Sequence, residues 1–358
     1  MINGIEQLAR AGALNLLQGC VGVASGDRLL LVESDGTDGY DPAVAAFVAT
    51  VAEELGCHVL RQRGPASVSP DDFPAALARA MSEVDHTIFF ARIGDQFRFQ
   101  GAPEACTKTM TYVLSLELMA AGFSRVPHGL MVAVLDRLTR RIADGGAWRI
   151  TCPLGSDISS SSLPFSIEED AGDFQLRLFP IGIFRPLDAA TMNGRLVTRW
   201  INATLNRHYE PEGFVLDEPV TLSLKAGRID GFEGPNAERV AAHFDHVASL
   251  FDIDGGKIFS WHAGIHPKTV YDGRMVDSFS RWGSVAFNSP RYTHLHTCGD
   301  EPPGEVSPVL IDATITFDGE VLWRDGRFVY LDRPEIAALR DDYGQAEDAF
   351  TPCREIGL

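Results

Sequence analysis

The segment Gly26-Asp27-Arg28-Leu29-Leu30-Leu31-Val32-Glu33 carries four consecutive large apolar residues between charged ends. A short apolar run bounded by turn residues is typical of a strand that is buried on both faces. Residues 42–55 follow as an Ala- and Val-rich helical pattern, which ends at Gly56. Further strand-like segments begin at Cys57 and at Asp85, the second after another helical stretch. This alternation of strands and helices predicts a parallel, Rossmann-like sheet in the first part of the chain.

The later part of the chain is richer in short strand patterns. Residues 220–232 alternate apolar and polar side chains around an Ala226-Gly227 turn, which predicts a hairpin. Residues 315–330 are predicted to form two hairpin strands with Asp-Gly turns. We therefore expect an α/β fold: an N-terminal Rossmann-like domain at residues 1–155, and a C-terminal β-rich α+β domain at residues 156–358 that carries the metal site argued below.

Three further segments are predicted to be helical, at residues 109–118, 130–143 and 236–250. The third contains His243 and His246, three residues apart. Because that helix has an apolar stripe of its own, we expect both histidines to lie on its surface.

The composition narrows the class of protein. The chain has 358 residues, of which 45% are hydrophobic and 22% charged, enough for two globular domains. Its net charge of −18 argues against nucleic acid or an anionic membrane as a partner. The first residues do not resemble a secretory signal, and no apolar run approaches the ~20 residues of a membrane helix. The six cysteines form no Cys-x-x-Cys pair, so we expect reduced thiols and a cytoplasmic protein.

Histidines are concentrated in one stretch, residues 258–312, which holds four of the ten in the chain. His294 and His296 are two residues apart, so on a strand their side chains point to the same face. Neutral imidazole is the commonest side-chain metal ligand, and an aspartate completes many such sites. His262, His294, His296 and Asp312 are therefore predicted to hold one metal ion. The alternative is that the paired histidines are ordinary strand residues.

The order of motifs resembles a superfamily that contains the leucyl aminopeptidase-like (aminopeptidase T type) metallopeptidases and the 2,5-dihydroxypyridine 5,6-dioxygenase-like iron enzymes. The resemblance covers most of the chain. The length of the chain is nearer that of the dioxygenase-like branch. The segments that carry it are residues 22–32, Arg149-Ile150-Thr151-Cys152-Pro153-Leu154-Gly155-Ser156-Asp157, Phe179-Pro180-Ile181-Gly182-Ile183-Phe184, Ala263-Gly264-Ile265-His266-Pro267, Val309-Leu310-Ile311-Asp312, and the hairpin motifs Phe317-Asp318-Gly319 and Arg324-Asp325-Gly326. The resemblance implies a metal-dependent enzyme and a homo-oligomer.

The departures from the family pattern concern its metal ligands. Ile183 stands at the family's acidic position, Ser260 at an upstream His or Glu position, and Leu310 at a ligand histidine. An apolar side chain cannot bind a metal, so the family's site does not carry over intact. We interpret His262 and the pair His294 and His296 as a relocated mononuclear site.

Three functions remain open on the sequence. The first is a mononuclear non-haem iron oxygenase, which uses Fe(II) and O2 on a small polar or heteroaromatic substrate. In it His266 or Glu301 would shuttle protons, and the predicted substrate-binding residues are Arg185, Trp261 and Arg281. Packing or surface roles are the alternatives for His266 and these three residues.

The second function is an aminopeptidase-like hydrolase in which Zn(II) or another divalent metal activates water, with Glu218 or Glu301 as base. The third is a metal-free binding protein that retains the fold.

Overall fold

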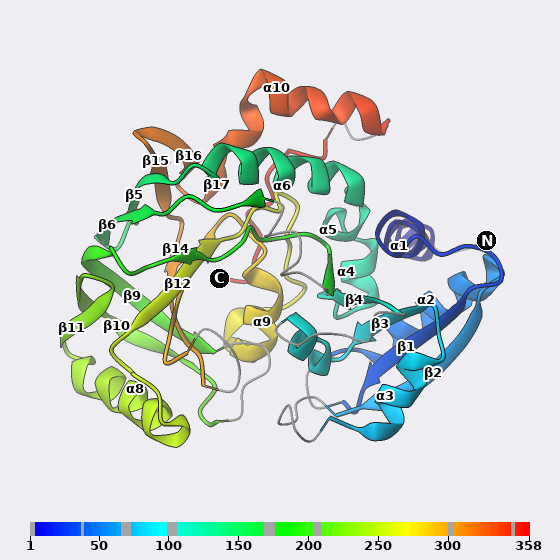
Figure 1. The fold of residues 1–358 in the computed structure, drawn as a ribbon, viewed down its shortest axis with the longest axis horizontal. Helices are drawn as coiled ribbons and strands as arrows, with labels where there is room; N and C mark the ends of the chain where they lie inside the picture. Colours follow the sequence, from blue (N-terminus) through cyan, green and yellow to red (C-terminus); the bar gives the residue numbers. More distant parts are fainter. Residues whose placement is uncertain are drawn as a thin grey trace.

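The computed structural model describes residues 4–36, 39–65, 73–98, 106–167, 176–203, 209–299, 304–344 and 348–358. Figure 1 shows a parallel sheet at one end of the molecule, a larger antiparallel sheet at the other, and helix α9 between them. Its helices are α1 (Gly4–Leu14), η1 (Asn15–Val21), α2 (Pro42–Glu54), α3 (Ala75–Ser82), η3 (Arg92–Arg98), α4 (Leu116–Ala120), α5 (Gly122–Arg125), α6 (His128–Ile142), α8 (Ala237–Phe251), η4 (Met275–Asp277), α9 (Phe279–Ala286), η5 (Val329–Asp332), α10 (Pro334–Ala337) and η6 (Ala338–Tyr343).

The parallel sheet has the strand order β2-β1-β3-β4-β7. Its strands are β1 (Arg28–Ser34), β2 (His58–Gly64), β3 (His86–Phe90), β4 (Thr107–Thr111) and β7 (Leu176–Phe179). Every residue of β1 after Arg28 is buried, which explains the continuous apolar run in the sequence. Helix α2 packs against β1 and β2, and its first turn is capped by the Asp41 side chain. The predicted Rossmann-like sheet is confirmed.

The helix predicted at residues 109–118 is wrong. Its first part is strand β4, which pairs with β3 on one side and β7 on the other. Thr107, Thr109 and Thr111 are β-branched residues, which pack well on a pleated surface and favour a strand. Helix α4 begins only after Ser115, whose side chain accepts a hydrogen bond from the backbone of Leu118.

The antiparallel sheet has the order β17-β16-β15-β5-β6-β9-β14-β13-β12-β8, and β10 and β11 extend it beside β9. Its strands are β5 (Gly146–Thr151), β6 (Asp157–Ser162), β8 (Leu187–Asp188), β9 (Asn193–Ala203), β10 (Phe214–Lys225), β11 (Arg228–Glu233), β12 (Ile258–Ala263), β13 (Tyr292–Thr297), β14 (Val306–Ile311), β15 (Thr314–Phe317), β16 (Glu320–Arg324) and β17 (Arg327–Phe328). The mixed α/β class is confirmed, as is the predicted hairpin of β10 and β11. Strands β5 and β6 of this sheet precede β7 of the parallel sheet in sequence. The sheets therefore interleave along the chain, and the domain division at residue 155 stays a prediction.

Helix α8 corrects one expectation. His243 is buried rather than on the surface, and its ring packs edge-on against Phe214 with 5.1 Å between centroids. Only His246 is exposed. Burial lowers the pKa of His243 to about 4. The apolar stripe of the helix is wider than the sequence suggested, and it includes an imidazole.

The antiparallel sheet separates two hydrophobic cores. On β14, Val309 belongs to the core that continues into the parallel sheet, whereas its neighbour Leu310 belongs to the second core. Alternation along a strand produces this division. Helix α9 joins the two halves, since the Arg92 guanidinium donates to the hydroxyl and the main-chain oxygen of Ser280.

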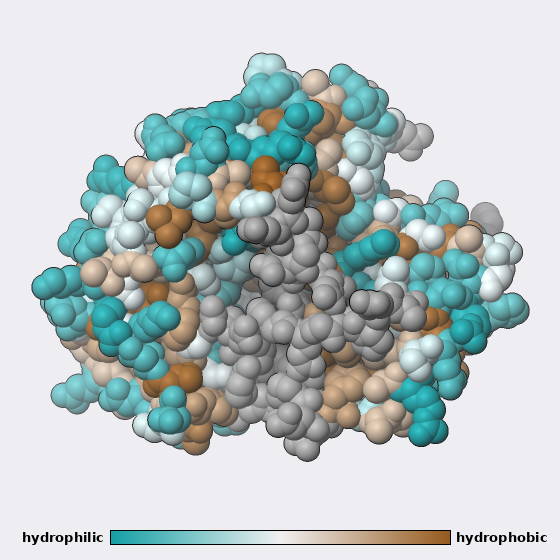
Figure 2. Space-filling model, viewed as in Figure 1, coloured by the Kyte–Doolittle hydropathy of each residue, from teal (hydrophilic) through white to brown (hydrophobic). Residues whose placement is uncertain are grey.

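The surface in Figure 2 is largely hydrophilic outside the grey atoms, with hydrophobic residues in small scattered groups. Among the described residues, we find no helix with the length and apolar character needed to cross a bilayer.

Candidate metal centre

Strands β12 and β13 bring three histidines together. The strands are antiparallel, with His262 directly opposite His294 and Ser260 directly opposite His296. Since alternate residues of a strand point to one face, all four side chains lie on the same face of the sheet. His294 is also opposite Val309 of β14, so this face points toward the core shared with the parallel sheet.

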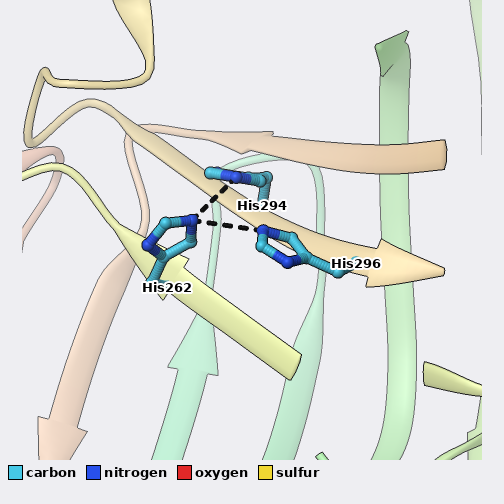
Figure 3. Close-up of side chains that lie close together, drawn as sticks. All are labelled: His262, His294 and His296. Carbon is cyan, nitrogen blue, oxygen red and sulfur yellow. Dashed lines mark hydrogen bonds between the residues drawn. The ribbon is translucent and has the colours of Figure 1, made fainter. Parts of the chain in front are cut away.

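The imidazole rings converge through their Nε2 atoms (Figure 3). The Nε2 of His262 lies 2.9 Å from that of His294 and 3.2 Å from that of His296. One nitrogen from each ring lies within 4.8 Å of the other two. Metal–nitrogen bonds of about 2.0–2.1 Å place neighbouring ligand nitrogens roughly 2.9–3.0 Å apart in an octahedral site and roughly 3.3–3.4 Å apart in a tetrahedral one. The observed separations match such spacings.

The tautomer of His262 follows from its second nitrogen. Its Nδ1–H donates to the main-chain carbonyl of Phe184 at 3.1 Å. A carbonyl can only accept, so the Nε2 of the neutral ring carries a lone pair that points at the other two histidines. His296 has a comparable arrangement, with its Nδ1 hydrogen-bonded to the Ser260 hydroxyl at 3.1 Å. Ligand histidines in metal sites are held in this way through the ring nitrogen that does not bind the metal.

The three rings are buried, with exposed fractions of 2% for His262, 8% for His294 and 7% for His296. Aromatic side chains surround them, since Tyr292 packs edge-on against His294 and Phe184 against His262. Such a shell excludes water and lowers the local dielectric, which strengthens the attraction between lone pairs and a cation. The donor set therefore fits a divalent metal ion.

The expected fourth ligand, Asp312, is not part of this group. Its carboxylate accepts two hydrogen bonds from Arg291, both 2.7 Å long, and one from Arg354 at 3.1 Å. Asp312 comes one residue after β14 ends and has a φ of 54°, so it no longer follows the alternation of the strand. The assignment of Asp312 as a ligand is corrected to a turn residue in an ion pair.

His266 is fully buried and lies outside the cluster of converging nitrogens. Among the described residues, neither of its ring nitrogens has a hydrogen-bond partner, and the ring packs edge-on against Phe123 at 5.1 Å. Burial lowers its pKa to about 3. These features favour a packing role over proton transfer. The other expected proton shuttle, Glu301, lies outside the described residues.

The three expected substrate-binding residues lie in three separate surroundings. Trp261 points to the opposite face from the histidines, where it is fully buried and edge-on to Trp148 at 5.2 Å. Arg281 forms a two-point ion pair with Asp272. The hydrogen bonds to Asp272 raise the pKa of the Arg281 guanidinium, although burial acts in the opposite direction. Arg185 follows Phe184, and its guanidinium lies 4.0 Å from the centre of the Phe165 ring.

Other polar residues on the histidine face were not singled out from the sequence. Tyr292 is two residues before His294, so the same alternation that paired the histidines would have found it. Asn202 donates a 2.8 Å hydrogen bond to the Tyr292 hydroxyl. Ser307 donates to the buried carboxylate of Glu305 at 2.7 Å. Their proximity depends on strand pairing between distant segments, which single residues in a sequence do not reveal.

Comparisons with known proteins support the fold. No protein-family model matches the sequence, and no curated protein matches it. The solved structure of 2,5-dihydroxypyridine dioxygenase from Pseudomonas putida KT2440 has a TM-score of 0.63 at 15% identity, covering 93% of this chain and 99% of that one. Wild-type AmpT from Thermus thermophilus has a TM-score of 0.48 at 12% identity, covering 90% of this chain and 98% of that one. The first likeness shows a shared fold, which is the fold that the sequence resemblance implied.

Proposed function

We propose that this chain is a mononuclear metalloenzyme, and that Fe(II) held by His262, His294 and His296 serves an oxygenase reaction. The observation that carries the proposal is the convergence of three buried imidazole nitrogens at 2.9 and 3.2 Å. When bound by nitrogen ligands with positions left open, Fe(II) supplies the chemistry by which O2 reacts with an organic substrate.

The chain's own residues would fix the ligands and exclude water. The carbonyl of Phe184 holds His262 in the tautomer that presents its Nε2 lone pair, and Ser260 orients His296. Three neutral imidazoles bring no negative charge to a divalent ion. The site therefore favours a substrate that binds through an anionic oxygen, such as an ionised aromatic hydroxyl.

The substrate class that we propose is a small hydroxylated aromatic or heteroaromatic compound, with O2 as the second substrate. The likeness in fold to a dioxygenase named for 2,5-dihydroxypyridine supports this choice. A zinc-dependent hydrolase is the second candidate. The 3.2 Å separation supports it, because it approaches the spacing of a tetrahedral site of three histidines and one water.

Metal analysis of protein without a histidine tag, purified anaerobically, tests the proposal. We expect about one iron per chain in the wild type and none in His294→Ala or His296→Ala. His246→Ala is the matched control, since His246 is an exposed histidine on α8, and it should retain the metal. One zinc per chain and no iron binding would favour the hydrolase. Wild-type protein that binds no metal after anaerobic reconstitution with Fe(II) would overturn both.

A further inference from the structure

Three polar residues, Ser307, Asn202 and Glu305, continue from the histidines onto the neighbouring strands and are called the polar row below. His294 is opposite Val309 and Thr297 is opposite Val306, without a register shift between them. The same register places Ser307 opposite His296. On its other side, Ser307 is paired with Asn202 of β9. Side chains in such cross-strand pairs lie about 4.5–5.5 Å apart at Cβ, so the row begins beside the candidate metal centre.

Glu305 lies at the end of this row. It is two residues before Ser307, and the Ser307 hydroxyl donates a 2.7 Å hydrogen bond to its Oε1. The Glu305 side chain therefore belongs to the same row. Its exposed fraction is 1%. A carboxylate is rarely buried, and one that lies in the polar row of a candidate centre is a functional-site candidate.

Tyr292 connects the row back to the histidines. Its ring packs against His294 at 5.3 Å, and its hydroxyl accepts the hydrogen bond from Asn202. Helix α9 covers the row, since a Cβ on Gly283 would come 2.3 Å from the Asn202 amide nitrogen.

We propose that Glu305 is the base of the site and accepts the proton that a substrate hydroxyl loses when its oxygen binds at the centre. The O–H bond breaks, its electron pair stays on the substrate oxygen, and the proton passes to the Glu305 carboxylate. No oxidant is consumed in this step. Ser307 is a positioning residue, because its hydrogen bond fixes one carboxylate oxygen. The inference rests on the proposed substrate class.

The test counts protons. Protein loaded with zinc, which does not reduce O2, is titrated with 4-nitrocatechol, whose visible absorbance reports its ionisation. Calorimetry in buffers of different ionisation enthalpy gives the number of protons released per probe bound. The wild type should release about one proton fewer than Glu305→Gln, because Glu305 retains it. Glu238→Gln, at an exposed site on α8, is the matched control and should behave as the wild type.

A second measurement needs no variant. The infrared difference spectrum of the wild type should gain the C=O stretch of a protonated carboxyl group when the probe binds, with a shift in D2O. Equal proton release in the wild type and Glu305→Gln, or no new carboxyl band, would overturn the role of Glu305 alone. Zinc-loaded wild type that does not bind the probe would overturn the substrate class and this inference together.

Discussion

His262 and His294 face each other across β12 and β13 with their Nε2 atoms 2.9 Å apart, while the Nδ1–H of His262 is committed to the Phe184 carbonyl. The Nε2 of neutral His262 is therefore an acceptor only. It also lies 3.2 Å from the Nε2 of His296, so a single lone pair faces two neighbouring ring nitrogens. A bound cation would accept a lone pair from each of the three rings at once.

Removal of metal should therefore lower the thermal stability of the wild type. At a metal concentration about 100 times the Kd, binding adds ~2.7 kcal/mol to the free energy of unfolding. Calorimetric melts with and without a chelator at pH 7 measure this difference. It should vanish in His262→Ala and persist in His246→Ala. A wild type whose melting temperature is unchanged after its metal has been removed contradicts the prediction.

Ser260→Ala should weaken metal binding. The substitution removes the hydroxyl that bonds the Nδ1 of His296 and so weakens the control of the ring's orientation. Loss of such an outer hydrogen bond typically costs about 10–100-fold in affinity. Competition against a chelating dye gives the Kd, and Ser249→Ala, at an exposed serine of α8, is the control. An unchanged Kd would show that Ser260 does not orient the ligand.

The ion pair of Arg281 and Asp272 should contribute to stability rather than to substrate binding. The Asp272 side chain has an exposed fraction of 16%, and although burial alone raises its pKa, hydrogen bonds from Arg281 and Ser115 hold that pKa below the usual value. Arg281 also donates to the carbonyl of Gly39, which links α9 to the first part of the chain.

A double-mutant cycle in urea with Arg281→Ala and Asp272→Ala should give a coupling energy of ~1–3 kcal/mol. The exposed pair Arg140 and Asp136 on α6 is the control, with about 0.5 kcal/mol or less. The contribution of Asp272 is present above its unfolded pKa and is lost as pH falls through its lower folded pKa. Coupling no larger than in the control would refute this prediction.

Acid should destabilise the protein through three histidines that are buried wholly or in part. Burial lowers the pKa of His128 and His243 to about 4 and that of His266 to about 3. Between these values and pH 6.5, the histidines bind protons in the unfolded chain but not in the folded chain. The free energy of unfolding should not depend on these histidines above about pH 6.5. Below that pH it should fall by up to ~1.4 kcal/mol per pH unit for each histidine. Urea unfolding between pH 7 and pH 4.5 measures this slope.

His266→Met should make the protein more stable at pH 7, by about 1 kcal/mol, because it replaces two unsatisfied polar nitrogens with an apolar side chain. The acid slope should also decrease by about one proton. His246→Gln on the surface should change neither quantity. Destabilisation by His266→Met would indicate that the imidazole has a buried hydrogen-bond partner.

The alternation of side chains along a single strand was enough to predict part of the histidine centre. The spacing of His294 and His296 places them on one face of any strand, and the same holds for Ser260 and His262. The register that sets His262 against His294 is a long-range pairing, which the sequence does not encode locally. Asp312 was misplaced because a residue just past a strand end loses the alternation, and its left-handed φ turns the side chain toward Arg291.

The buried strands of the parallel sheet were predictable because β1 has an uninterrupted apolar run. Strand β4 was not recognised, since its alternation of threonine with Lys108 and Met110 lacks such a run and an apparent helical pattern follows. Glu305 lies among glycines and prolines in the sequence, where nothing distinguishes it from a loop residue. Only the pairing of β13 with β14 places it at the end of the row that begins beside His296.

The group that orients His262 is a backbone carbonyl, so it is the same whatever side chain occupies position 184. Substitution there can change the packing of the core without deleting the hydrogen bond that selects the ligand tautomer. His296, by contrast, depends on a hydroxyl that a single nucleotide change can remove. The two ligands should therefore differ in mutational robustness, and sequence drift in this fold would be expected to alter the His296 side of the centre first.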